Sequence, residues 1–104
     1  MSDKLSNAEK LVMKVIWDAG YPVTCREVID RLYNNYGRNY ADTTVYTFLT
    51  NIKKKGYISS QRKGVNYFEA IKDRDVFIRE ELKDFMMLWL DDDKEKIKAY
   101  IDEL

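Results

Sequence analysis

The chain lacks the residues on which many catalytic and metal sites depend. It contains no histidine, one cysteine and one proline among 104 residues. Without histidine there is neither a histidine general base nor a histidine metal ligand, and Cys25 has no second cysteine with which to form an internal disulfide. The sequence contains no nucleophile–base pair, phosphate-binding loop or metal cluster. We therefore predict a protein that is not an enzyme and that uses no cofactor or metal.

Long apolar stretches are missing as well. No apolar run approaches the ~20 residues that span a bilayer. The N-terminal segment MSDKLSNAEK is polar and lacks the apolar core of a signal peptide. Apolar residues still make up 45% of the chain, an ordinary share for a globular protein. We expect a cytoplasmic protein without a membrane partner, built as one domain or one domain plus an appendage.

Charge is separated along the chain, although the net charge is zero. Residues 1–72 contain 12 Lys or Arg and 7 Asp or Glu, a balance of +5. Residues 73–104 contain 6 Lys or Arg and 11 Asp or Glu, a balance of −5. A basic N-terminal part and an acidic C-terminal part suit a module that contacts a polyanion with one end only. Chance asymmetry in a small protein is the alternative explanation.

Two capping boxes predict the starts of two helices. Ser6 and Glu9 precede an apolar stripe that indicates a helix over residues 7–19. Thr24 and Glu27 open a second helix. The buried stripe expected on this second helix consists of Val28, Ile29, Leu32, Tyr33 and Tyr36.

The only proline lies in the link between these helices, and the only cysteine directly follows the link. Residues 21–24 are expected to be extended, because Pro22 keeps Tyr21 out of the helical region. Cys25 follows in the first turn of the second helix, where the pKa of a thiol can fall. Both a redox role and a role as a small, half-buried packing residue are open, and the packing role is favoured.

Residues 40–58 carry the clearest functional pattern. A third helix is expected from Ala41 or Asp42 to Lys55, where Gly56 stops it. Its apolar face, spaced i, i+3, i+4, i+7, consists of Val45, Phe48, Leu49 and Ile52. Its other face can offer hydrogen-bond donors, acceptors and methyl groups to base edges in a DNA major groove. The residues on this face are Thr43, Thr44, Tyr46, Thr47, Thr50 and Asn51. The alternative is an ordinary amphipathic helix with a solvated polar face.

A basic hairpin is predicted after this helix. Residues 57–62 and 67–71 have the pattern of two strands around a turn at 63–66. Three helices followed by a basic-tipped hairpin is the order of a winged helix-turn-helix domain. Cations at the end of the third helix (Lys53–Lys55) and at the hairpin tip can contact phosphates. The predicted DNA-backbone contacts are Thr50, Asn51, Lys53, Lys54, Arg62 and Lys63. A solvated helix end and hairpin tip are the alternative.

From Asp73 the chain is again expected to be helical. The FMMLWL run at 85–90 is apolar almost all round, so it must be covered on more than one side, and a domain this small has little left to cover it. Asp91-Asp92-Asp93 then breaks and recaps the helix. We predict a homodimer interface made of Leu82, Phe85, Met86, Trp89, Leu90, Ile97 and Ile101. The core of a larger monomer is the alternative.

Four segments carry a resemblance to a known family. They are LSNAEKLVMKVIW (5–17), REVIDRL (26–32), TTVYTFLTNIKKKGYI (43–58) and RKGVNYF (62–68). The positions that match the family pattern are Ser6, Ala8, Glu9, Val12, Met13, Trp17, Thr44, Thr47, Lys55 and Gly56. In these segments the chain resembles the penicillinase-repressor family of bacterial transcription repressors (BlaI and MecI) and the related copper-transport repressors (CopY).

The resemblance implies a mainly α fold with a small β-hairpin wing. A winged helix-turn-helix DNA-binding domain over residues 1–72 would precede a helical dimerisation region over residues 73–104. The implied function is that of a homodimeric repressor that binds a dyad operator. Its third helix would enter the major groove, and its wing would lie on the backbone or minor groove. By matching position, the residues that the resemblance implies as base readers are Thr43, Thr44, Tyr46 and Thr47. A winged-helix module that binds proteins instead of DNA is the alternative, but such a surface would more often expose apolar groups.

The sequence departs from the family pattern at several positions. Ala41-Asp42-Thr43 stands where Ser-Pro-Lys often precedes the shared threonine, and the common arginine at the position of Tyr46 or Asn51 is absent. In the penicillinase branch a membrane sensor's signal leads to proteolysis in the C-terminal region. Here no asparagine follows Asn66, so the Asn-Phe cleavage site is missing, as are the copper branch's paired cysteines. The operator, the inducer and any upstream sensor or protease are therefore not given by the resemblance.

Overall fold

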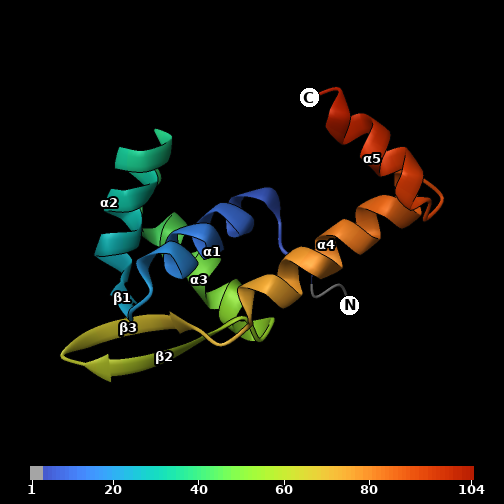
Figure 1. The fold of residues 1–104 in the computed structure, drawn as a ribbon. Helices are drawn as coiled ribbons and strands as arrows, with labels where there is room; N and C mark the ends of the chain where they lie inside the picture. The colour runs from blue at the N-terminus through green and yellow to red at the C-terminus, as the bar shows by residue number, and fades with distance from the viewer. Residues whose placement is uncertain (1–3) are drawn as a thin grey trace. The chain divides into compact units, whose positions relative to one another are not determined.

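The computed structural model describes residues 4–104 and has the expected fold class, mainly α with a small β wing. The elements in chain order are α1 (Asn7–Ala19), β1 (Val23–Thr24), α2 (Cys25–Tyr36), α3 (Asp42–Lys54), β2 (Ile58–Lys63), β3 (Val65–Ala70), α4 (Arg74–Trp89) and α5 (Lys94–Asp102) (Figure 1). Their contacts divide the chain into an N-terminal unit that ends at Lys72 and a C-terminal unit that begins at Asp73. No helix within residues 4–104 is long and apolar enough to cross a membrane.

The first helix has the bounds and the cap that the sequence predicts. Ser6 Oγ accepts a hydrogen bond from Glu9 N at 3.2 Å, and Glu9 Oε1 accepts one from Ser6 N at 2.8 Å. These two bonds satisfy amide groups that the first turn of a helix leaves without a partner. Val12, Met13, Val15 and Ile16 then point into the core.

The second helix buries a narrower stripe than its sequence suggests. Thr24 Oγ1 accepts from Glu27 N at 3.1 Å, and the left-handed Gly37 ends the helix. Val28 and Leu32 are fully buried. The prediction that Tyr33 is buried was wrong, because its side chain is 59% exposed. One residue beyond Leu32, it is turned about 100° around the helix and away from the core.

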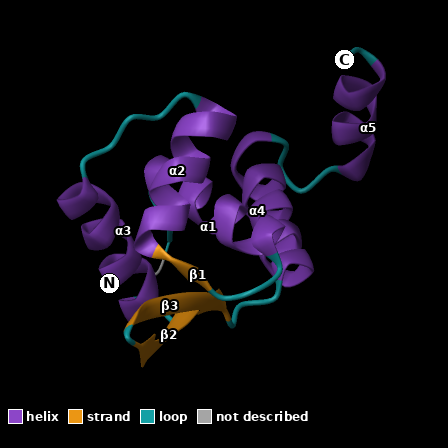
Figure 2. Cartoon of the chain, turned by 90° about the vertical axis from the view of Figure 1, so that its left-hand side faces the viewer, coloured by secondary structure: helices purple, strands orange, loops and turns teal. Residues whose placement is uncertain are grey.

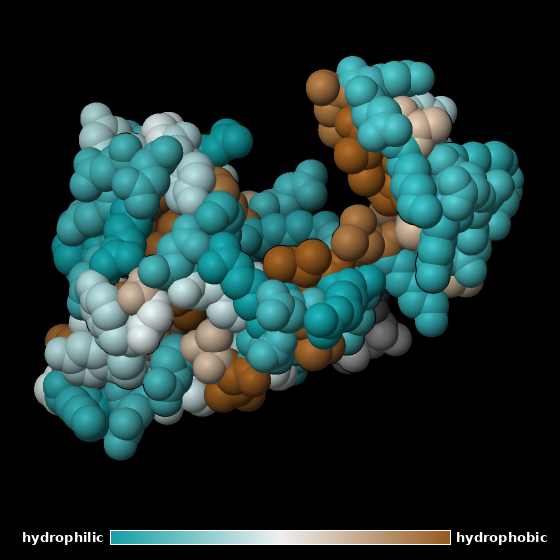
Figure 3. All heavy atoms as spheres, viewed as in Figure 1, coloured by the Kyte–Doolittle hydropathy of each residue, from teal (hydrophilic) through white to brown (hydrophobic). Residues whose placement is uncertain are grey.

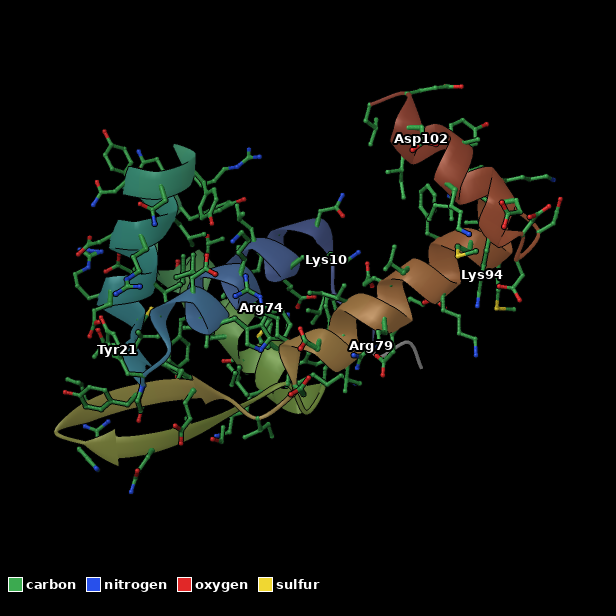
Figure 4. The ribbon with its side chains drawn as sticks, in the orientation of Figure 1. Lys10, Tyr21, Arg74, Arg79, Lys94 and Asp102 are labelled. Carbon is green, nitrogen blue, oxygen red and sulfur yellow. The ribbon has the colours of Figure 1, made fainter. Side chains whose placement is uncertain are left out.

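The sheet contains one strand more than the predicted hairpin. The strand order is β1-β3-β2, all antiparallel, and the sheet lies against the helices α1–α3 (Figure 2). The short extended link at 21–24 thus includes a strand, in which Val23 pairs with Phe68. Beside it Tyr21 lies next to α2 (Figure 4), where its hydroxyl accepts a hydrogen bond from Arg31.

The hairpin turn is also tighter than expected. Lys63 pairs with Val65, so Gly64 alone reverses the chain rather than residues 63–66. Gly64 has φ 77°, a left-handed conformation that glycine adopts without a steric penalty. Arg62 and Lys63 therefore stand at the very end of the wing, as predicted.

The base of the hairpin is fastened to α1. The carbonyl of Tyr57 accepts from the amides of Ile71 and Lys72 at 2.9 and 3.1 Å. The indole Nε1 of Trp17 donates to the carbonyl of Lys72 at 3.0 Å. The N-terminal unit therefore ends at a residue that is held by a contact 55 positions away in sequence.

A buried ion pair joins the start of α1 to the end of α3. Lys55 Nζ lies 2.7 Å from Glu9 Oε1, and the Glu9 side chain is only 5% exposed. Lys55 Nζ also donates to the carbonyl of Lys4 at 3.0 Å. Lys55 was expected to belong to a solvent-facing lysine cluster that can contact phosphates, and the structure instead turns it inward.

The C-terminal unit consists of two capped helices. Asp73 Oδ1 accepts from Val76 N at the start of α4, and Asp93 Oδ1 accepts from Glu95 N at the start of α5. Between them Asp91 and Asp92 have φ values of 50° and 59°. Aspartate tolerates this left-handed region better than most residues. The expected helix break and recapping at 91–93 are therefore present.

We expect Lys55→Ala to destabilise the protein by about 2–3 kcal/mol, because it leaves the Glu9 carboxylate buried without a cation. The value lies below the usual range for a buried pair because the Lys55 side chain keeps 23% exposure. Lys54→Ala removes the neighbouring, exposed lysine and should change stability by less than about 0.5 kcal/mol. Urea unfolding of both variants measures the difference, and equal effects would show that the ion pair does not hold α3.

The ion pair between Glu9 and Lys55 should also make the stability of the protein depend on pH. Burial alone would raise the pKa of Glu9, but hydrogen bonds from Lys55 and Ser6 and the charge of Lys55 hold that pKa below its ordinary value of 4.5. The contribution of Glu9 to stability is therefore fully present above pH 4.5 and is lost as the pH falls through the lowered pKa. A protonated Glu9 needs no cation, so the stability gap between wild type and Lys55→Ala should narrow in acid. A gap that stays constant down to pH 3, about one unit below the usual carboxyl range, would contradict this assignment.

Candidate nucleic-acid interface

The helix α3 has one buried and one solvent-facing side. Val45, Leu49 and Ile52 are fully buried. The predicted base-reading residues occupy the other side, where Thr43, Tyr46 and Thr47 are exposed and Thr44 is half-buried. Of the predicted backbone contacts, Lys53, Lys54, Arg62 and Lys63 are exposed, whereas Thr50 and Asn51 are half-buried.

Two threonine hydroxyls on this face are already used as donors. Thr47 Oγ1 donates to the carbonyl of Thr43, and Thr50 Oγ1 donates to the carbonyl of Tyr46, both at 2.9 Å. These side chains therefore present oxygen lone pairs and methyl groups to solvent rather than hydroxyl hydrogens. A methyl group can contact the methyl of thymine, and an oxygen can accept from a base amino group.

Tyr46 lies where three elements meet. An open hollow of about 430 Å³ is lined by Thr24, Cys25, Arg26, Tyr46, Val65, Asn66 and Phe68. The hollow thus brings the start of α2, the helix α3 and the strand β3 to one place. Tyr46 is 51% exposed at its edge, with its hydroxyphenyl ring available to a ligand.

Cys25, which also lines this hollow, is half-buried. Burial raises the pKa of its thiol, and the nearby charge of Asp42 raises it further against the opposing effect of Arg26. A thiol with a raised pKa is largely protonated at neutral pH and is a poor nucleophile. This environment fits the packing role that the sequence favours.

The wing is coupled to α3 through Lys53. Lys53 Nζ donates to Ser60 Oγ on β2 at 2.7 Å. Side chains alternate between the two faces of a strand, so Arg62 lies on the same sheet face as Ser60, with Asn66 opposite it on β3. Lys53 and Arg62 therefore meet the same face of the sheet, whereas the same alternation places Lys63 on the opposite face, beside Ser59 and Gln61.

A further ion pair at the start of α3 was missed by the sequence analysis. Arg26 Nη2 lies 3.1 Å from Asp42 Oδ1, and Arg26 Nε lies 3.9 Å from Asp30 Oδ1. No side chain caps the start of α3. Nothing in the local sequence indicates that Arg26, on another helix, is its partner.

The C-terminal unit presents an apolar groove between its two helices. It has a volume of about 820 Å³ and is lined by Phe77, Ile78, Glu81, Leu82, Phe85, Trp89, Leu90, Ile97, Tyr100, Ile101 and Leu104. Figure 3 shows the most hydrophobic residues as brown spheres along the facing sides of α4 and α5. Trp89 is 67% exposed and Phe85 is 51% exposed.

The predicted interface residues do not all share this exposure. Leu82 and Ile101 are exposed, whereas Met86 and Ile97 are half-buried. Leu90 is only 5% exposed in the single chain, so little of it is left for a partner. Met86 does not line the groove. Within residues 4–104 no group of three or more side chains is arranged to hold a metal ion.

The N-terminal unit consists of three helices, a short strand after the first helix and a β-hairpin after the third. These elements define a winged helix-turn-helix domain. The chain belongs to the penicillinase-repressor family, whose model, described as "Penicillinase repressor", matches residues 5–103.

Two solved structures are similar to the chain. The DNA-binding domain of the repressor BlaI is 30% identical, with a TM-score of 0.59, over 69% of this chain and 85% of that one. The monomeric form of Bacillus licheniformis BlaI in complex with the blaP half-operator is also 30% identical, with a TM-score of 0.56 and the same coverage.

One curated relative is similar over a shorter stretch. An uncharacterized 16.5 kDa protein of Latilactobacillus sakei, encoded in the ptsI 3' region, is 29% identical over 63 residues. The match covers 61% of this chain, and the chain spans 41% of that relative.

Proposed function

We propose that this protein is a DNA-binding transcriptional repressor that acts as a homodimer on a dyad operator. The observation that carries the proposal is the solvent-facing Thr/Tyr side of α3, with exposed Lys53 and Lys54 at the end of the same helix and exposed Arg62 and Lys63 at the wing tip. The similar fold of BlaI has been solved in complex with a half-operator, which supports the same use of the fold here.

In this proposal α3 enters the major groove. The residues that read base edges are Thr43, Thr44, Tyr46 and Thr47. Thr50, Asn51, Lys53 and Lys54 approach the sugar–phosphate backbone, and Arg62 and Lys63 place the wing on the backbone or the minor groove. Phosphate contacts position a protein on the duplex, whereas base contacts supply its specificity. A winged-helix module for protein partners is the competing function, and the polar character of the α3 face speaks against it.

The C-terminal unit would supply the dimer. A groove lined by exposed side chains such as Trp89 and Phe85 is costly in water, since burying one such side chain is worth ~1.5–3 kcal/mol. A second copy related by a two-fold axis covers the groove and makes every contact twice. Such a dimer presents two copies of α3, and a dyad operator would place its half-sites one or two DNA turns apart. Residues 1–72 would thus bind DNA and residues 73–104 would hold the dimer.

Salt dependence and base preference should separate positioning residues from reading residues. A dimer that neutralises ~6 phosphates should lose DNA affinity with a log–log salt slope near −5. Lys54→Ala should weaken binding to all sequences alike and flatten the slope by about 1 for each half-site. Tyr46→Ala should instead lower the preference for operator over random DNA by ~1–3 kcal/mol per half-site.

The control for these variants is Lys14→Ala, which removes an exposed lysine of α1 that pairs with Asp18. It should leave both the slope and the preference unchanged. Fluorescence anisotropy across a salt series measures all of these quantities. A DNA affinity that does not change with salt concentration would count against a DNA function. If Tyr46→Ala keeps the full preference for operator over random DNA, Tyr46 does not read bases.

Trp89→Asp should convert the dimer to a monomer, because it places a carboxylate in the groove of both subunits. The matched control is Met87→Asp, since Met87 is also an exposed residue of α4 (58%) but does not line the groove. Sedimentation at micromolar concentration should give a dimer for wild type and Met87→Asp. It should give a monomer with weakened operator binding for Trp89→Asp. A wild-type protein that sediments as a monomer yet binds the operator tightly would refute the dimer.

A further inference from the structure

Asp42 is a carboxylate in an unexpected place. It is the first residue of α3, on the helix that the proposed function places in a polyanionic groove. Its side chain is 77% exposed, and Oδ1 accepts a hydrogen bond from Arg26 Nη2 at 3.1 Å. An exposed pair of this kind contributes little to stability. A carboxylate at this position also repels phosphate, so it opposes binding unless the DNA offers it a hydrogen-bond donor.

The position of Asp42 on the helix favours base contact. The N-terminal residues of a recognition helix are the ones that reach base edges. At about 100° per residue, Asp42 and Tyr46 lie about 40° apart, on the same side of α3. Lys53 lies between them in angle, and its bond to Ser60 shows that this side faces the wing. Asp42 is therefore aligned with a residue that we assign to base reading.

The chemistry of the carboxylate narrows the choice of base. An ionised aspartate only accepts hydrogen bonds. In the major groove, guanine offers only acceptors, and thymine offers an acceptor and a methyl group. Adenine places a donor beside its N7 acceptor, which repels a carboxylate, whereas cytosine offers the N4 amino donor alone. Cytosine is thus the base that suits Asp42.

We propose that Asp42 determines specificity by accepting a hydrogen bond from the N4 amino group of one cytosine in each half-site. Arg26 is a positioning residue, whose guanidinium holds the carboxylate in place from the start of α2. Where a sequence lacks this cytosine, the carboxylate faces acceptors or phosphates and binding is penalised. This inference rests on the proposed DNA-binding function and adds a base identity to it.

The test is selection of bound duplexes from a randomised pool, followed by affinity measurements on the enriched sequences. Wild type should enrich a dyad sequence with cytosine at one position of each half-site. Replacing that cytosine should weaken binding at least about 5-fold, the lower end for one mismatched base pair. Asp42→Asn should lose the preference for cytosine and gain one for adenine at the same position, because asparagine pairs with adenine N6 and N7.

Further variants and a stability measurement make the result specific. Asp18→Asn removes a carboxylate from another exposed ion pair, with Lys14 on α1, and should keep the wild-type base preference. Arg26→Gln should weaken the cytosine preference at that one position, and Arg26→Lys should restore part of it. Thermal unfolding of each variant, expected near wild type, shows that the fold is intact.

The outcomes separate this inference from the proposed function. If wild type enriches a dyad sequence and Asp42→Asn enriches the same sequence, the inference is wrong and the DNA-binding function stands. A uniform rise in the affinity of Asp42→Asn for all sequences would likewise overturn it, because Asp42 would then only repel phosphate. If wild type enriches no sequence, the proposed function fails, and the inference fails with it.

Discussion

The buried carboxylate of Glu9 holds the first and third helices together, and the orientation of the proposed reading face depends on it. Glu9 caps its own helix through Ser6 and accepts from Lys55 at the end of α3, at 2.8 and 2.7 Å. A charge that is 5% exposed requires a partner, so the helix end that carries Lys55 is held at a defined place. With Val45 and Leu49 packed against the core, the opposite side of α3 has only one direction in which to face.

The three consecutive lysines at the end of α3 show how a charged run is divided by geometry. Successive residues are turned about 100° around a helix, so three consecutive lysines face three different surroundings. Lys53 bonds to Ser60 on the wing, Lys54 points to solvent, and Lys55 pairs with Glu9. Of the three lysines, only Lys54 is exposed and takes part in neither of these contacts, so it is the clearest probe of phosphate binding. The two units also differ in how much of their apolar surface is buried. The core side chains of α1–α3 and of the strands are covered, whereas the groove of the C-terminal unit is open to solvent.

Features that depend on neighbouring residues were predictable from the sequence. The bounds of α1, the caps at Ser6 and Thr24, the helix break at 91–93 and the basic wing tip were all expected and are all present. Each depends on interactions within about four positions, where chemistry and spacing can be read directly. The family pattern extended this reading to the fold class. The exposure of the proposed reading face was also predictable, because an apolar stripe with helical spacing determines which side is buried.

The sequence by itself determined where the helices begin and end, which side of α3 is apolar, and that the last helices carry more apolar surface than they can bury. Tertiary structure alone decided that Val23 joins the sheet beside Phe68, that Lys55 turns inward to Glu9, and that Arg26 meets Asp42. These partners lie 45, 46 and 16 positions apart, so their meeting depends on how whole elements pack and not on local spacing. The type of a residue limits which bonds it can form, and the fold determines which partner lies within reach.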